Sequence, residues 1–167
     1  MKIYSTLLLA LAGALSANAA NPGIAETKLT YGQIKTNIVK AAEKMPADAY
    51  SFRATPEERT FAELVGHIAD AQIRICGAAT GETKPAEAGK LSAKEGLVAA
   101  LKASFDFCDA ALESVSDENA GTMMKFQRAE RSKLGIMTYN VIHDNESYGT
   151  MAVYLRLKGV VPPSSEK

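Results

Sequence analysis

Apolar residues recur at steps of three and four in four separate segments, and this spacing predicts four amphipathic helices. The segments cover about residues 27–45, 60–77, 92–115 and 134–158, with no strand pattern between them. The expected fold is therefore all-α, a four-helix bundle. The predicted core stripes are, in chain order, Tyr31, Ile34, Ile38, Ala41, Ala42 and Met45; Phe61, Leu64, Val65, Ile68, Ala71 and Ile75; Leu97, Leu101, Phe105, Cys108, Leu112 and Val115; and Ile136, Tyr139, His143, Glu146, Thr150, Val153 and Leu157.

Local signals mark several of the helix ends. Thr60 and Glu63 are spaced as a capping box at the start of the second helix, and Ser92 and Glu95 are spaced as another at the start of the third. The second helix is expected to end at a pair of glycines four residues apart. Residues 116–133 include a charged run at 125–131, and we expect this segment to be a solvated loop.

The chain has two histidines, and both fall near the middle of a predicted helix. His143 lies on the core stripe of the fourth helix, and His67 lies at the edge of the stripe of the second. Bundles build metal sites from inward side chains on facing helices, and neutral imidazole is a common ligand of divalent transition metals. A lone inward histidine is more often a hydrogen-bonded core residue. The pattern leaves both interpretations open.

Three further polar side chains lie within reach of this predicted centre. Glu146 follows His143 by three residues, so both project from one turn. It is either an oxygen ligand or general base, which makes it the candidate catalytic residue, or a carboxylate at the margin that reaches solvent. Asp70 either orients the ring of His67 or lies on the surface. Tyr139 either donates a hydrogen bond into the cavity or packs.

The first twenty residues differ in kind from the rest. Lys2 precedes an uncharged apolar run at residues 3–15, and Ala17-Asn18-Ala19 has the form of a signal-peptidase site. The run is shorter than the roughly 20 residues that span a bilayer. We therefore expect a signal peptide at 1–19, a single domain at 20–167, and an exported protein that is periplasmic or extracellular.

Export makes the two cysteines relevant, because disulfides persist in oxidising compartments. Cys76 and Cys108 each lie about sixteen residues into their helices. If those helices are parallel, the sulfurs have similar heights and can bond. If they are antiparallel neighbours, the pair stays reduced. The sequence leaves both outcomes open.

Charge excludes one class of partner. The chain has 19 basic and 19 acidic residues, so nothing in its net charge favours binding to a phosphate backbone. We expect no nucleic-acid partner, and no membrane attachment once the signal is removed. Bundles with an apolar outer face often dimerise, so a second copy of the chain is a candidate partner.

Two segments carry a family resemblance. Residues 61–70, FAELVGHIAD, and residues 140–149, NVIHDNESYG, resemble the second-helix and fourth-helix motifs of the DinB/YfiT-like family. The tail at 154–163, YLRLKGVVPP, extends the similarity, which covers nearly the whole mature chain. The resemblance implies an up-down-down-up bundle with a crossover loop between helices 2 and 3. Residues 80–91 agree, since they would reach roughly 40 Å when extended.

The family also implies a divalent metal, often zinc or nickel, held by three histidines. His67 matches the ligand of the second helix and His143 matches the first ligand of the fourth. The third position is Ser147, whose neutral hydroxyl is a weak ligand. We therefore expect a metal-dependent protein with its site between helices 2 and 4, acting on an unknown small molecule. The alternative is a non-catalytic small-molecule-binding bundle with a degenerate metal site.

Overall fold

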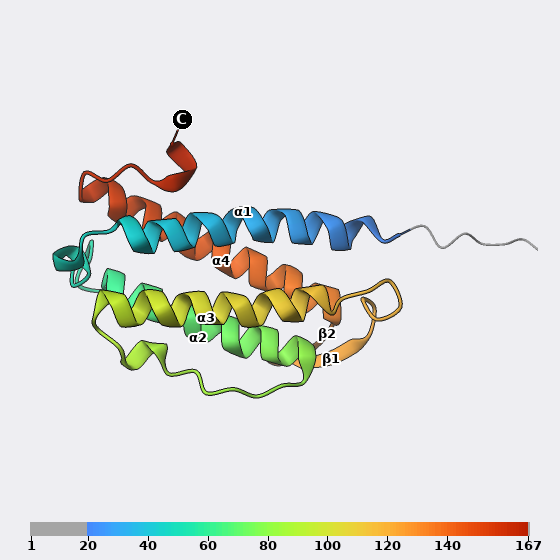
Figure 1. Ribbon diagram of the computed structural model, residues 1–167. Helices are drawn as coiled ribbons and strands as arrows, with labels where there is room; N and C mark the ends of the chain where they lie inside the picture. Colours follow the sequence, from blue (N-terminus) through green and yellow to red (C-terminus); the bar gives the residue numbers. More distant parts are fainter. Residues whose placement is uncertain (1–19, 167) are drawn as a thin grey trace, which may run out of the picture.

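The computed structural model describes residues 20–166, so the predicted signal peptide at 1–19 lies outside the described part (Figure 1). No helix within that part combines the length and apolarity needed to cross a bilayer. Its elements are the helices α1 (Pro22–Lys44), α2 (Phe61–Thr80), α3 (Lys94–Glu113) and α4 (Lys133–Leu157), the strands β1 (Met123–Phe126) and β2 (Ala129–Ser132), and the short 3-10 helices η1 (Ala47–Ala49), η2 (Ala88–Lys90) and η3 (Pro163–Ser165).

The four helices form the predicted up-down-down-up bundle. Figure 1 shows α2 and α3 running in the same direction, with α1 and α4 running the opposite way. The segment between α2 and α3 crosses the bundle from one end to the other and includes η2. A chain that returns along the outside in this way lets two consecutive helices pack in parallel, and α2 packs against both α3 and α4.

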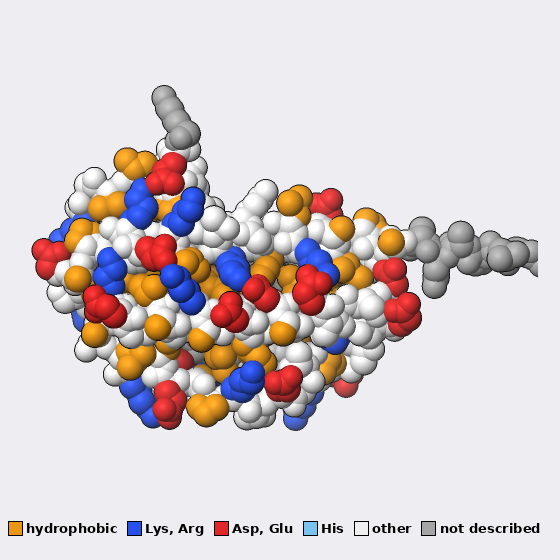
Figure 2. Space-filling model, viewed as in Figure 1, with side chains coloured by type: hydrophobic (Ala, Val, Ile, Leu, Met, Phe, Trp, Pro, Cys, Tyr) orange, Lys and Arg blue, Asp and Glu red, His pale blue; other side chains and the backbone are white. Residues whose placement is uncertain are grey.

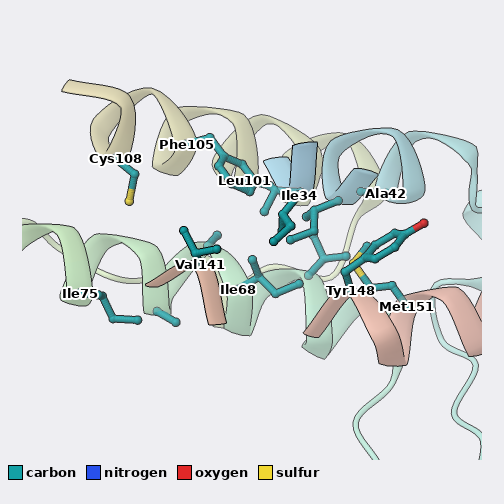
Figure 3. Close-up of a cluster of buried hydrophobic side chains, with 14 of the residues drawn as sticks. Ile34, Ala42, Ile68, Ile75, Leu101, Phe105, Cys108, Val141, Tyr148 and Met151 are labelled. Atoms are coloured by element: carbon teal, nitrogen blue, oxygen red, sulfur yellow. The ribbon is translucent and has the colours of Figure 1, made fainter. Parts of the chain in front are cut away.

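The core confirms three of the four predicted stripes. All the predicted residues of α1, α2 and α3 are buried, and Figure 3 shows Ile68, Leu101 and Val141 projecting from different helices into one cluster. Burial of these side chains is the main source of stability in a bundle.

The predicted stripe of α4 is only partly correct: Ile136 is buried and Tyr139, His143 and Thr150 are half-buried, but the other three residues are exposed. Val153 and Leu157 are 51% and 57% exposed, and Glu146 also faces solvent. The helix carries apolar side chains on both sides, so the spacing alone could not choose its inward face. The buried residues of α4 are Ile136, Met137, Asn140, Val141, Asp144, Ser147, Tyr148, Met151, Ala152, Tyr154 and Leu155.

The helix-end predictions had mixed outcomes. The capping box of Thr60 and Glu63 is present, and Gly81 ends α2 with φ of 79°. The second capping box is wrong, because α3 begins after Ala93, whose side chain makes no capping bond. The predicted loop at 116–133 contains an antiparallel hairpin in which Phe126 pairs with Ala129. These four-residue strands bury only Phe126 fully, so they left no alternating pattern to detect.

The crossover segment is held against α2 by two contacts. The carboxylate of Asp70 accepts hydrogen bonds from the backbone amides of Ala88 and Gly89, at 2.7 and 3.0 Å. One turn earlier, a Cβ on Gly66 would lie 2.9 Å from the carbonyl oxygen of Ala88. Only a glycine allows so close an approach. Asp70 therefore anchors the crossover, and of its two predicted alternatives the one in which it orients His67 is wrong.

A disulfide joins Cys76 of α2 to Cys108 of α3, with the two Cα atoms 5.3 Å apart. The bridge depends on the parallel direction of these helices, which places the two cysteines at the same height. Both residues are fully buried. Of the two outcomes that the sequence left open, the structure has the bridged one.

We predict that Gly66→Ala destabilises the fold by about 1–3 kcal/mol, because the added methyl meets backbone atoms that cannot move aside. The matched control is Gly149→Ala in α4, where a Cβ would have nothing within 4 Å. That change should stabilise the protein by up to about 1 kcal/mol through helix propensity. Denaturant unfolding followed by circular dichroism measures both, and shifts in the same direction would contradict the close packing at Gly66.

Candidate functional site

The two histidines meet between α2 and α4. The Nε2 atoms of His67 and His143 lie 3.2 Å apart, and the ring centroids are 5.2 Å apart at an angle of 52°. Both side chains are half-buried. The convergence of the two imidazoles, which the sequence predicted from their mid-helix positions, is thus present in the structure.

Both rings line a pocket of about 590 Å³ between α2, the hairpin and α4. The volume lies in the range of small-molecule sites. Tyr139 and Phe126 contribute aromatic surface, with their rings in an edge-to-face arrangement at 5.2 Å. Tyr139 therefore packs at the wall of the pocket, which is the second of its two predicted alternatives.

A chain of buried polar side chains lies behind His143. Asn140 donates one amide group to Gln72 Oε1 at 3.0 Å and to Asp144 Oδ2 at 3.1 Å. Asp144 Oδ1 lies 3.7 Å from Nδ1 of His143. Gln72, Asn140 and Asp144 are fully buried. The three side chains therefore connect the core between α2 and α4 to the inner edge of the His143 ring.

This polar chain retains unused hydrogen-bonding capacity. Gln72 Nε2, Asn140 Oδ1, His143 Nδ1 and Asp144 Oδ1 are buried and lack a hydrogen-bond partner within the described part of the chain. Buried polar atoms without partners are rare because each costs free energy. His143 Nδ1 and Asp144 Oδ1, which lie 3.7 Å apart, are the two of these atoms at the edge of the site, too far apart for a hydrogen bond but close enough to interact electrostatically.

The surroundings of the site raise the pKa of Asp144 and lower the pKa of His67. Burial raises the pKa of Asp144, and interactions with His143 and Asn140 oppose that rise. Burial also lowers the pKa of His67, and the positive charges of Arg59, His143 and Arg74 lower it further. A lowered pKa keeps the His67 ring neutral near pH 7, which is the form that binds a metal ion.

Ser147, which stands at the third ligand position that the sequence resemblance implies, has its hydroxyl already engaged. It is buried and donates a hydrogen bond to the backbone carbonyl of His143 at 2.9 Å. Within residues 20–166, no group of three or more histidine, cysteine or acidic side chains is arranged to hold an ion. The described residues therefore bring two imidazole nitrogens together here, without a third strong donor beside them.

Of the two alternatives for Glu146, the structure has the solvent-exposed one, so Glu146 is not placed to act in the site. The buried acid beside His143 is Asp144, which was not among the predicted site residues. Asn140 and Asp144 are four residues apart on a helix whose buried side chains are mostly apolar. That spacing was a usable signal, and it was missed because the inward face of α4 was misplaced. Tyr148 packs away from the site, where its hydroxyl bonds Ser164.

Comparison with known proteins identifies the fold and the family. The chain is similar to the crystal structures of a DinB-like protein of Bacillus cereus ATCC 10987 (TM-score 0.66, 19% identity, covering 86% of this chain and 96% of that one) and of the DinB-like protein YjoA of Bacillus subtilis (0.66, 18%, 83% and 92%). It is also similar to an uncharacterised protein of Escherichia coli UTI89 (0.62, 13%, 82% and 95%). A search of curated proteins gave no match.

At these identities the structural likeness establishes the fold alone. The family rests on the sequence profile of the DinB superfamily, which matches residues 31–151, more than half of the 167-residue chain. The protein therefore belongs to the DinB superfamily.

Proposed function

We propose that the protein is metal-dependent and binds one divalent ion through Nε2 of His67 and Nε2 of His143. The observation that carries this proposal is their separation of 3.2 Å. Two nitrogens bound to one tetrahedral zinc at 2.0–2.1 Å lie about 3.3 Å apart. The two rings therefore have the spacing of a shared ion without any movement of α2 or α4.

The surroundings of His143 support the same assignment. When Nε2 binds an ion, Nδ1 carries the proton, and here Nδ1 faces the carboxylate of Asp144. Carboxylates in this position fix the ring and make it a stronger ligand. Without an ion, the same distance lets one imidazole donate to the other. That hydrogen bond alone gives no role to the buried carboxylate behind the ring.

We propose zinc or nickel as the ion, because imidazole ligands suit both. A divalent ion there would supply Lewis acidity toward an oxygen or sulfur atom of a small-molecule substrate. The pocket would bind that molecule, and Asp144 would hold the His143 ring in place. Export remains part of the proposal, and the Cys76–Cys108 bridge supports it because structural disulfides are typical of oxidising compartments.

We predict that the protein binds zinc with a stoichiometry of one ion per chain. His67→Ala or His143→Ala should weaken binding by more than about 100-fold, since removing a ligand exceeds the 10–100-fold effect of its outer partners. Acidification should release the ion, because protons compete for Nε2. The lowered pKa of His67 keeps zinc bound near neutral pH and moves release to lower pH. Competition titration with a chelating dye measures both effects.

The matched control is Glu146→Ala, which removes an exposed acid from the turn that carries His143. Zinc affinity should stay the same in this variant. A protein purified without chelator that takes up no zinc or nickel, or one whose zinc binding survives loss of both histidines, would contradict the proposal.

A second prediction concerns Asp144. Asp144→Asn keeps the shape of the side chain but removes the charge that faces His143, and zinc affinity should fall about 10–100-fold. The same variant should keep the helical content of the parent by circular dichroism. Unchanged zinc affinity in a folded Asp144→Asn protein would show that the carboxylate has no role in orienting His143.

The alternative function is a small-molecule-binding bundle that has lost its metal. Ser147 and the absence of a three-ligand cluster in the described part of the chain favour it. The discriminating variant is Ser147→His. If the parent binds no metal and this variant binds zinc tightly, the natural site is a degenerate one. If the parent already binds zinc, the alternative is excluded.

A further inference from the structure

We propose that the histidine pocket binds a small organic anion, whose charged group is held by Arg74 and Lys125. This inference deepens the proposed function by naming the substrate class, and its catalytic meaning rests on that function. The binding itself depends only on the shape and charge of the pocket, so it can be tested with or without a metal ion.

The charge of the pocket wall is the first observation. Arg74, Lys125 and the two histidines line the pocket, and no lining residue is acidic. The chain as a whole is neutral, so this local excess of positive charge does not follow from composition. Two carboxylates lie close by without lining the pocket: Glu130 is the cross-strand partner of Lys125, and Asp144 is fully buried behind His143.

Several lysines and arginines of the bundle have their charge balanced by an acidic partner, and in the described part of the chain these two cations do not. Between α1 and α3, ion pairs join Lys28 to Glu113 and Lys102 to Glu43, and Figure 2 shows acidic and basic side chains interspersed over one face. Within residues 20–166, neither Arg74 nor Lys125 belongs to an ion pair, whereas both lie at the pocket. An unpaired guanidinium is the side chain best suited to bind a carboxylate or phosphate.

The shape of the wall matches such a ligand. Arg74 follows His67 by seven residues, which is two turns along one face of α2, or about 10 Å. Ala71 and Ala78 lie on the same side, and their small side chains leave the hollow open. The anionic group can therefore bind Arg74 and Lys125 while the rest of the molecule extends toward the histidines.

The opposite wall supplies an aromatic surface and one polar group. Phe126 packs against Tyr139, and the amide of Gln127 lies 3.5 Å from the Tyr139 hydroxyl. Gln127 has φ of 54°, a left-handed conformation that is unfavourable for a residue other than glycine. Strained positions of this kind are concentrated at ligand sites. The turn of the hairpin thus holds a polar side chain at the pocket in place of the glycine that its backbone favours.

A second hollow, elsewhere on α2, does not share this character. It measures about 730 Å³, lies under the crossover segment, and is lined by Asp70 and Glu87 as well as by Lys84 and Lys90. Its acidic and basic residues balance, and Asp70 is used to anchor the crossover. The histidine pocket differs from this hollow because Arg74 and Lys125 line it together with the two histidines, and no acidic residue does.

The test uses three probes of similar size: benzoate, phenyl phosphate and neutral benzamide. Each is titrated into metal-free and zinc-loaded protein and followed by calorimetry and NMR shifts. We expect at least one anion to bind and benzamide to bind at least tenfold more weakly. Arg74→Gln combined with Lys125→Gln should reduce anion affinity at least tenfold. Arg128→Gln, a matched charge loss on the same hairpin outside the pocket lining, should change it less than twofold.

Failure of both anions to bind would overturn the inference, as would equal binding of benzamide or an equal loss in the Arg128→Gln control. Circular dichroism of each variant confirms that the exposed substitutions leave the bundle folded. The two proposals fail separately. Zinc uptake without anion binding overturns only the anion site, and anion binding that depends on Arg74 without any metal uptake overturns only the metal function.

Discussion

The hydrogen bond between Gln72 and Asn140 joins α2 to α4 inside the core, and the arrangement of the site depends on it. Burying an amide or a carboxyl without a partner costs several times what a misplaced methyl group costs. Asn140 reaches Gln72 only when α4 turns this face inward, so that hydrogen bond sets the rotation of α4. Asp144, one turn along the same face and bonded to Asn140, is turned inward with it. The apolar residues Ile142, Val153 and Leu157 are left outside as a consequence.

That rotation also explains where His143 lies. When α4 turns Asn140 and Asp144 inward, His143 lies at the border between α4 and α2, with its ring half exposed to the pocket. His67 holds the equivalent border position on α2, and the two Nε2 atoms meet at 3.2 Å. The polar core is thus the support of the site: it fixes the helix that carries one imidazole and places a carboxylate beside that ring.

The chain shares its scaffold with the DinB superfamily, whose profile matches residues 31–151. Of the three metal-ligand positions that the sequence resemblance implies, two hold His67 and His143, and the third holds Ser147, whose hydroxyl bonds the backbone of its own helix. A two-histidine centre leaves more positions open to other ligands than a three-histidine centre does. An anionic molecule held by Arg74 and Lys125 would lie beside those open positions. The Cys76–Cys108 bridge adds a covalent link between the parallel helices.

The sequence alone determined the number of helices, the inward faces of three of them and the existence of the histidine pair. Those features follow from hydrophobic spacing and helix geometry, which are local properties. Only the tertiary structure decided which face of α4 turns inward, that Asp70 anchors the crossover, and that Asp144 is the carboxylate beside His143. Apolar residues occur in similar numbers on both faces of α4. The position of Gln72 on the neighbouring helix α2 therefore decides which face turns inward. The hairpin that closes the pocket was also beyond the sequence, because its short strands are stabilised by packing against α2 and α4 rather than by a pattern of their own.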